Sequence, residues 1–467
     1  MTQPKNRNNE QPAYTQFEQL GWRTRPGILA KQATSAQSVH ALLGYFLSDR
    51  SSPSPFPGRD MLLDSGLFEW GVAPPLERVI RSAFELDYLL TLPQVFRNSI
   101  SVVEPWKNVG INVQGEEVRA SKNIAYILQQ VADADTTLYP VWQSGIKEPE
   151  RLASVMSAGL ATVVQGGNPS AYDPDSFSGS AAPLDDLLSL IDQLLMSRSA
   201  QSAPCIFVCL GHQLAMQSHI RLIRQAVQEV ARLDHLPLDA NDLVLTSLRR
   251  VCQTIQSVGE SLVVLKGGAA IATGWEDRLF AVARNEEFEV GARRLQPYRR
   301  GPGLDHIPGE LHDAHALIAD ELDGVIDSML SMERDLSIAM FHGDEVNEEA
   351  ALFANWAYKL LHDTLVPIRY EIAVSPLSWL LKLPYALEIL SQTQVDEYHW
   401  TEVSTTCIYY KDWETHTIRR SFTCQFHPEL MADIRDIGRR EGPRYAELKD
   451  NDGVRLLTRL LYHGMQE

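Results

Sequence analysis

The chain has 467 residues, of which 44% are hydrophobic, so it holds enough apolar material for a full core. Its formal net charge of -18 argues against binding to nucleic acid or to an anionic membrane surface. No apolar run approaches the roughly 20 residues that a membrane span needs. Five cysteines without regular spacing indicate neither a disulfide framework nor a paired-cysteine metal site. Because the first residues are also polar and lack a signal-peptide core, we expect a reduced, cytoplasmic protein.

Residues 1–95 are predicted to form an N-terminal extension that is mostly helical, and no chemistry can be assigned to it. From about Ser99 the chain alternates between short apolar runs and amphipathic stretches. The runs predict strands, and the stretches between them predict helices with one apolar face. The strands are expected at 109–113, 136–142, 160–164 and 205–208, and the helices around 124–131, 148–157, 184–195 and 214–230. This alternation predicts an α/β fold with a mostly parallel sheet flanked by helices, in which active groups lie at the carboxyl ends of strands.

The second half of the chain continues this pattern less regularly. Helices are predicted at 243–255 and 317–329, and strands at 261–265, 337–341, 405–410 and 417–426. Residues 348–395, rich in Leu, Trp and Tyr, are predicted to form a helical insertion. We therefore expect one α/β domain over residues 96–467.

Cys209 is the first candidate for chemistry. It follows the apolar run Cys205-Ile-Phe-Val208, and an amphipathic helix begins directly after it. A cysteine on a sharp turn between a strand and a helix is held clear of the sheet, and the helix N-terminus favours its thiolate form. Cys209 is therefore a candidate nucleophile, although a buried structural cysteine is the alternative.

His427 and Glu429 supply the partners that a nucleophile needs. They follow the predicted strand that ends at Phe426, and Pro428 fixes the backbone between them. A carboxylate that holds one ring nitrogen of a histidine leaves the other nitrogen facing a thiol. The three residues together indicate a nucleophile, a base and the group that orients the base.

Two glycines, Gly166 and Gly167, also stand at the end of a predicted strand. They form either a plain turn or a place where backbone N–H groups approach a substrate oxygen closely. Two other motifs are weaker. Lys266-Gly-Gly268 lacks the spaced glycines of a phosphate-binding loop, so we interpret it as a turn. His312-x-x-His315 lacks further ligands at a defined spacing, so no metal or other cofactor is predicted.

Four segments, in order, resemble the class I (triad) glutamine amidotransferases, with motifs closest to the GMP synthetase branch. They are Gln165-Gly-Gly-Asn-Pro-Ser-Ala-Tyr-Asp173, Cys209-Leu-Gly-His-Gln213, Met340-Phe-His-Gly-Asp-Glu-Val346 and Gln425-Phe-His-Pro-Glu429. The resemblance covers roughly residues 99–430 and implies a flavodoxin-like core. Three residues depart from the family pattern: Phe207 replaces a glycine, Asn168 a proline and Phe341 a serine. Phe207 implies a turn at Cys209 that is built differently or is less strained.

The resemblance implies that Cys209 attacks the side-chain amide of glutamine, with His427 as base and Glu429 as its orienter. It also implies an oxyanion hole formed by the N–H groups of Gly167 and Leu210. Gly166, Gln213 and His342 would help to hold the glutamine, whereas His212 is not the base. The expected function is a glutaminase that supplies ammonia to an acceptor or to a partner synthetase subunit. The alternatives are a γ-glutamyl hydrolase with the same triad and a non-catalytic, glutamine-sensing or partner-binding protein.

Overall fold

The fold is given by a computed structural model of the whole chain. It describes residues 99–106, 109–111, 117–119, 124, 137–142, 146, 149–157, 159–177, 182–196, 204–233, 243–266, 268–298, 308–311, 313–314, 336–394, 401–428, 453, 456–457 and 460. The predicted N-terminal extension 1–95 and the predicted helix 317–329 lie outside these residues.

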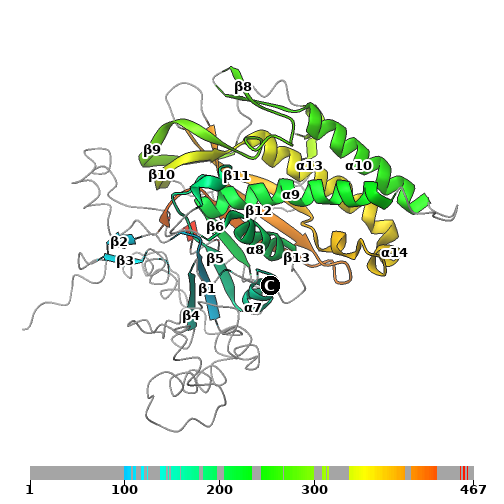
Figure 1. Cartoon of the computed structure of the whole chain (residues 1–467), viewed down its shortest axis with the longest axis horizontal. Coiled ribbons are helices and arrows are strands. Elements are labelled where there is room, and N and C mark those ends of the chain that lie inside the picture. Colours follow the sequence, from blue (N-terminus) through cyan, green and yellow to red (C-terminus); the bar gives the residue numbers. More distant parts are fainter. Residues whose placement is uncertain are drawn as a thin grey trace, which may run out of the picture.

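A mixed sheet runs through the centre of the molecule (Figure 1). Among the described residues it has nine strands in the order β10-β9-β11-β12-β13-β6-β5-β1-β4. One half of it is parallel and consists of β4 (Thr137–Trp142), β1 (Ser99–Glu104), β5 (Ala161–Val164), β6 (Cys205–Val208) and β13 (Ile418–Cys424). The other half is antiparallel and consists of β10 (Leu336–Val346), β9 (Val282–Pro297), β11 (Ala386–Gln394) and β12 (Thr401–Lys411), the last of which also pairs antiparallel with β13.

The prediction of a mostly parallel sheet is therefore wrong for half of the strands, although the α/β fold is confirmed. Sequence patterning did not reveal β9, because its central stretch, 283–289, is rich in charged residues. β9 and β10 pair along nearly their full lengths, from Leu336 opposite Leu295 to Val346 opposite Val282. Long antiparallel strands of this kind need no crossover helix, so the alternation of strands and helices ends at β9.

The helices of the parallel half agree with the sequence pattern. They are α7 (Pro149–Ser157), α8 (Leu184–Met196) and α9 (Leu210–Arg232), and α10 (Leu243–Ser261) packs beside α9. Two small antiparallel pairs lie outside the main sheet: β2 (Val109–Ile111) with β3 (Glu117–Arg119), and β7 (Val263–Lys266) with β8 (Ala269–Thr273). Lys266 and Gly268 lie at the β7–β8 hairpin, which confirms the interpretation of this motif as a turn.

The predicted helical insertion 348–395 is helical only in its first part. It contains α13 (Glu348–Leu365), α14 (Arg369–Ala373) and two 3₁₀ turns (Val366–Ile368 and Ser378–Lys382). The last nine residues, Ala386–Gln394, form β11 in the main sheet. This part of the prediction is wrong because the apolar residues of β11 gain their partners from β12, which a local pattern cannot show.

Strand alternation divides the core into two layers. Val103, Val164 and Phe207 point into a cluster that α8, α9 and α13 cover. Val102 and Val163 point the other way, into a cluster that includes Ile124 and the described residues near the C-terminus. Since both faces of the parallel half are buried, its strands are rich in apolar residues, and the polar side chains within them, such as Ser101 and Thr162, are buried too.

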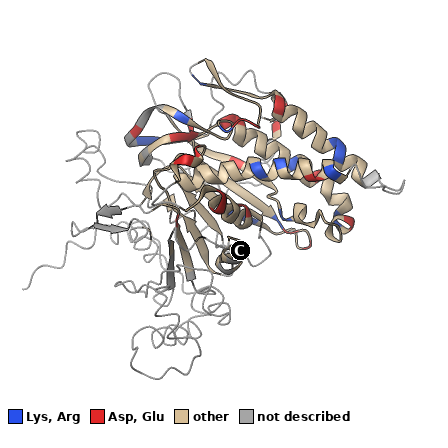
Figure 2. Ribbon diagram, viewed as in Figure 1, with Lys and Arg blue, Asp and Glu red and all other residues tan. Residues whose placement is uncertain are grey.

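Charged residues lie mainly on the helices and at the rim of the antiparallel half (Figure 2). Arg221 on α9 forms an ion pair of 2.9 Å with the buried Asp192 of α8. In the part of the chain that the structure describes, no helix is long and apolar enough to cross a membrane.

Candidate functional site

Cys209 occupies a strained turn between β6 and α9. β6 ends at Val208, α9 begins at Leu210, and Cys209 has φ 49° and ψ -110°. A residue with a side chain rarely adopts this conformation, which costs about 1–3 kcal/mol. The Cys209 N–H donates to the carbonyl of Cys424 on the neighbouring strand at 2.7 Å, and this bond holds the turn in place.

The turn is strained although Phe207, and not glycine, stands two residues before Cys209. The side chain of Phe207 is fully buried and packs into the helix-covered layer of the core, whereas Cys209 belongs to the opposite layer. The two side chains therefore point away from each other. The expectation that Phe207 makes the turn differently built or less strained stays a prediction, although Cys209 has a positive φ with Phe207 in place.

Gly166 brings Cys209 and His427 together. A Cβ atom at Gly166 would lie 2.9 Å from Cβ of Cys209, 3.5 Å from its Sγ and 3.2 Å from Cε1 of His427. The cysteine and the histidine therefore both touch the same glycine, at the carboxyl ends of the adjacent strands β6 and β13. Both side chains are buried. Any larger residue at position 166 would push into the space between them.

Gly167 and Leu210 lie next to each other, as the predicted oxyanion hole requires. A Cβ atom at Gly167 would lie 3.0 Å from Cδ2 of Leu210 and 2.7 Å from Cβ of Trp106. Leu210 is the first residue of α9, so its N–H is one of the amides that have no acceptor within the helix. Gly211 lets the helix start close to β5, because a Cβ there would lie 2.5 Å from the carbonyl oxygen of Val164.

Two glutamines connect Cys209 to the His342 segment. The amide nitrogen of Gln425 lies 3.8 Å from the sulfur of Cys209 and donates toward it. The amide nitrogen of Gln213 lies 3.5 Å from the side-chain oxygen of Gln425 and donates to the carbonyl of Asp344 at 2.8 Å. Gln213, which sequence analysis selected, therefore fixes the backbone of the predicted substrate-binding segment.

The Asp344 side chain joins this segment to the glycine loop. It forms hydrogen bonds with the side chains of Ser170 and Tyr172, both from the stretch that follows Gly166 and Gly167. Burial raises the pKa of Asp344, and these two hydrogen bonds and His342 act against that rise. All four resembling segments thus come together at one end of the sheet.

His212 is a structural residue in spite of its closeness to Cys209 in sequence. Its Nε2 donates to the carbonyl of Val403 at 3.1 Å, so its Nδ1 accepts from the hydroxyl of Thr423 at 2.5 Å. Burial lowers the pKa of His212 to about 3, which keeps the ring neutral. Because both ring nitrogens are used within the sheet, His212 cannot act as the base.

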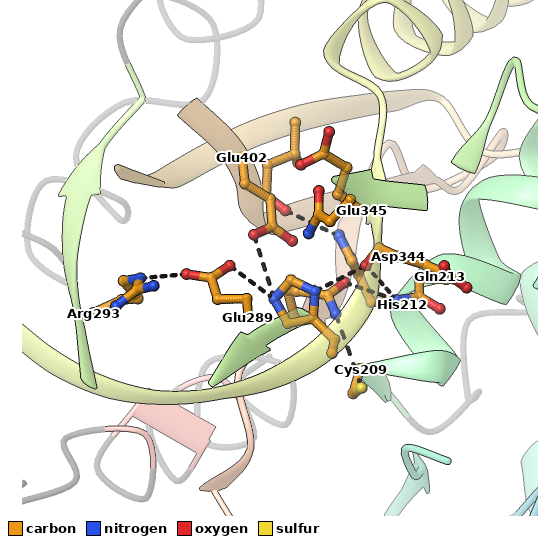
Figure 3. A network of polar contacts seen from close by, with 12 residues as sticks. Cys209, His212, Gln213, Glu289, Arg293, Asp344, Glu345 and Glu402 are labelled. Atoms are coloured by element: carbon orange, nitrogen blue, oxygen red, sulfur yellow. Dashed lines mark hydrogen bonds and ion pairs between the residues drawn. The ribbon is translucent and has the colours of Figure 1, made fainter. Parts of the chain in front are cut away.

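A buried acidic cluster lies beside these residues (Figure 3). The Nε2 atom of His342 is 3.3 Å from a carboxyl oxygen of Glu289 and 3.4 Å from one of Glu402. Glu289 also pairs with Arg293. The predicted role of His342 in holding glutamine stays a prediction, but the structure places its ring between the two carboxyl groups.

The two carboxyl groups of the cluster differ in their charge state. Burial, and then the neighbouring carboxylates Glu289 and Glu345, hold the pKa of Glu402 well above its usual range. Burial also acts to raise the pKa of Glu289, but His342 and Arg293 outweigh it and hold that pKa below its usual value. In the described structure we therefore expect Glu289 to be ionised.

Some predicted residues lie outside the described part of the chain, namely Glu429, His312 and His315. Sequence analysis missed Glu289, Glu402 and Gln425. Glu289 and Glu402 belong to no local motif. Pattern analysis missed β9, which carries Glu289, and predicted that β12 begins at residue 405, after Glu402. Gln425 stands two residues before the predicted base and could have been found from its place directly after β13.

Comparison with protein-family models finds no match for this chain, and comparison with curated proteins also finds none.

Proposed function

We propose that this chain is a glutamine amidotransferase of the class I (triad) type, which hydrolyses the side-chain amide of glutamine and supplies ammonia to an acceptor. The observation that carries the proposal is the strained turn at Cys209, whose side chain shares Gly166 as a neighbour with His427. A cysteine in this conformation at the end of a central parallel strand is the arrangement expected of an activated nucleophile.

In the proposed reaction, Cys209 Sγ attacks the side-chain carbonyl carbon of glutamine while His427 accepts the thiol proton. The carbonyl oxygen becomes an oxyanion, which the N–H groups of Gly167 and Leu210 stabilise by about 3 kcal/mol per donor. The C–N bond then breaks, His427 returns the proton to the leaving nitrogen, and ammonia departs. A γ-glutamyl thioester remains on Cys209.

Water completes the reaction. His427 takes a proton from the attacking water, the C–S bond breaks, and the proton passes to the departing sulfur, so glutamate is released and the thiol is restored. In this proposal Glu429 orients His427, and Gln425 supplies an N–H that supports negative charge on the sulfur. We also assign the recognition of glutamine to the segment around Asp344, whose carbonyl accepts from Gln213.

Among the departures from the family pattern, the altered residue Phe207 is the one that would support the non-catalytic alternative, because it stands two residues before the nucleophile. The alternative loses that support because Cys209 keeps a positive φ with Phe207 in the core. The γ-glutamyl hydrolase alternative uses the same atoms and differs only in the leaving group, so the identity of the preferred substrate has to separate the two.

The test measures ammonia and glutamate release from glutamine by the purified chain and by Cys209→Ala. We expect release by the wild type and a decrease of at least about 1,000-fold in the variant. Cys252→Ala is the matched control, since Cys252 is also buried but lies on α10. Faster hydrolysis of a γ-glutamyl peptide than of glutamine would favour the hydrolase.

If the lone chain releases nothing, covalent labelling decides. A glutamine-like diazo-ketone should alkylate Cys209 selectively, and peptide mass spectrometry would locate the adduct. Absence of both turnover and selective labelling at Cys209 would refute the proposed function and favour a binding protein.

A further inference from the structure

The acidic cluster of Glu289, His342 and Glu402 is assembled by the antiparallel half of the sheet. Glu289 on β9 and His342 on β10 are directly opposed residues of one antiparallel pair, so their side chains share a face. Glu402 reaches the same point from β12. The exposed fractions of the three residues are only 3%, 4% and 1%, so water has little access to them.

The ring of His342 has a defined orientation. Its Nδ1 lies 2.9 Å from the carbonyl oxygen of Asp344, and because a carbonyl only accepts, Nδ1 must carry the proton. In the neutral ring the lone pair of Nε2 therefore faces the two carboxyl groups. A hydrogen bond from one ring nitrogen to a backbone carbonyl is the usual way in which proteins orient a metal-binding histidine.

The cluster has more electron-rich atoms than hydrogen-bond donors. Among the described residues, Nε2 of His342, one oxygen of Glu289 and both oxygens of Glu402 have no hydrogen-bond partner. Arg293 pairs with the other oxygen of Glu289, and Lys266 pairs with nearby Glu345 at 2.7 Å. Buried lone pairs that converge in this way are costly unless a proton or a metal cation lies between them.

The separations fit a small metal ion. Zn²⁺ binds histidine nitrogen and carboxylate oxygen at about 2.0–2.2 Å, which places neighbouring ligand atoms of a tetrahedron about 3.4 Å apart. The observed distances from Nε2 to the two carboxyl groups are 3.3 and 3.4 Å, and the three ligand atoms all lie within 4.8 Å of one another. An imidazole ligand favours zinc, copper, iron or nickel over magnesium, calcium or manganese.

We propose that Glu289, His342 and Glu402 form a binding site for a divalent transition-metal ion, with Zn²⁺ as the best fit. Arg293 and the carbonyl of Asp344 orient the ligands from outside. Gln213 donates to the same carbonyl, so the site is connected to the Cys209 region through two glutamines (Figure 3). The site does not depend on the proposed function, because Cys209 is not one of its ligands.

The test is a Zn²⁺ titration of the full chain after metal removal, in competition with a chromophoric chelator. We expect one Zn²⁺ per chain, and at least about 10- to 100-fold weaker binding in Glu402→Gln and His342→Asn. Glu388→Gln is the matched control, because Glu388 is a buried glutamate on β11 that bonds to Tyr409 and lies outside the cluster. This control and Cys209→Ala should both bind Zn²⁺ as the wild type does.

X-ray absorption of the zinc-loaded wild type tests the ligands without any substitution. One nitrogen and two carboxylate oxygens at about 2.0–2.2 Å would support the site, whereas a sulfur at about 2.3 Å would mean that a cysteine binds the metal instead. The proposal is overturned by that sulfur, by the absence of a one-to-one Zn²⁺ complex, or by unchanged affinity in both ligand variants. The last two results would mean that the cluster holds a proton only.

Discussion

The parallel half of the sheet and the antiparallel half place different chemistry at the same end of the molecule. The parallel half presents Cys209 and His427 at the ends of β6 and β13, with Gly166 at the end of β5. The antiparallel half presents the acidic cluster within β9 and β10 and at the start of β12. Strand ends thus supply the candidate nucleophile and base, and residues within the strands supply the buried charges.

This difference follows from how the two halves bury their strands. The parallel strands lie between two apolar layers, so the polar residues within them are small side chains such as Ser101 and Thr162, and the larger polar groups of the site lie where strands end. The antiparallel half has room for buried polar groups because cross-strand neighbours supply partners, as Tyr409 does for Glu388. Buried chemistry in the antiparallel half therefore depends on pairs and clusters, not on single residues.

Gly166→Ala is the strongest test of the parallel half, since we expect it to abolish most activity without unfolding the chain. The added methyl group would lie 2.9 Å from Cys209 Cβ and 3.2 Å from His427 Cε1, and so it would force the two side chains apart. A displacement of about 1 Å at a reacting group costs about 100-fold, and we expect at least that loss in kcat/KM for glutamine. If the lone chain has no turnover, the rate of Cys209 alkylation is the readout.

Gly309→Ala is the matched control, because a Cβ atom at Gly309 meets nothing within 4 Å. Circular dichroism should show the same secondary structure in both variants. Full activity in Gly166→Ala would contradict the placement of Cys209 and His427 against one glycine.

Two buried carboxyl groups, Glu349 on α13 and Asp192 on α8, allow the two halves to be compared by pH. Burial, and then the neighbouring Glu345, raise the pKa of Glu349 to about 7. Burial raises the pKa of Asp192 to about 6, and Arg221 acts against that rise. The folded state therefore holds the proton more tightly than the unfolded state in both cases. Because of this, the free energy of unfolding falls as pH rises from the unfolded pKa through the folded one.

We expect Glu349→Gln to remove most of the fall that occurs between pH 6 and 7, because Asp192, with a pKa of about 6, is already more than half ionised over this range. At pH 8 this variant should be more stable than the wild type, by up to about 3 kcal/mol, and near pH 4 the two should be equal. Urea unfolding at several pH values measures this. Asp192→Asn is the control, and its free energy of unfolding should keep most of the slope between pH 6 and 7. Loss of that slope in the control would mean that Asp192, and not Glu349, is the group that titrates there.

Most of the parallel half could be predicted from the sequence because its signals are local, but β1 was missed, and the predicted strand 109–113 corresponds to β2, which lies outside the main sheet. The apolar run before Cys209 and the helical spacing after it define β6 and α9 within one short stretch. Gly166, Gly167 and His427 each follow such a run, so their meeting at one edge follows from parallel pairing alone. Their closeness in the structure is consistent with that reasoning.

The antiparallel half could not be predicted in the same way. The stretch 283–289 of β9 is rich in charged residues, and such a pattern indicates an exposed segment. Only pairing with β10 gives Glu289 and His342 a common buried face. Glu402 joins them from a strand that follows much later in the chain. Clusters that form through tertiary contacts leave no periodicity or spacing to detect.

The smallest expected effect concerns the turn at Cys209, where the backbone conformation of the candidate nucleophile costs stability. Glycine adopts φ 49°, ψ -110° without strain, so Cys209→Gly should unfold less easily than Cys209→Ala. The strain of about 1–3 kcal/mol is partly offset by the greater entropy of glycine in the unfolded chain, which leaves about 1 kcal/mol. Chemical denaturation of both inactive variants measures this difference.

The same pair of substitutions at Cys205 gives the control. Cys205 lies within β6, where glycine weakens a strand, so Cys205→Gly should be less stable than Cys205→Ala. If the glycine variant is the more stable one at position 209 and the alanine variant is the more stable one at position 205, the backbone at Cys209 is strained to hold its side chain there. If the alanine variant is the more stable one at both positions, the turn carries no strain, and the main support for an activated cysteine is lost.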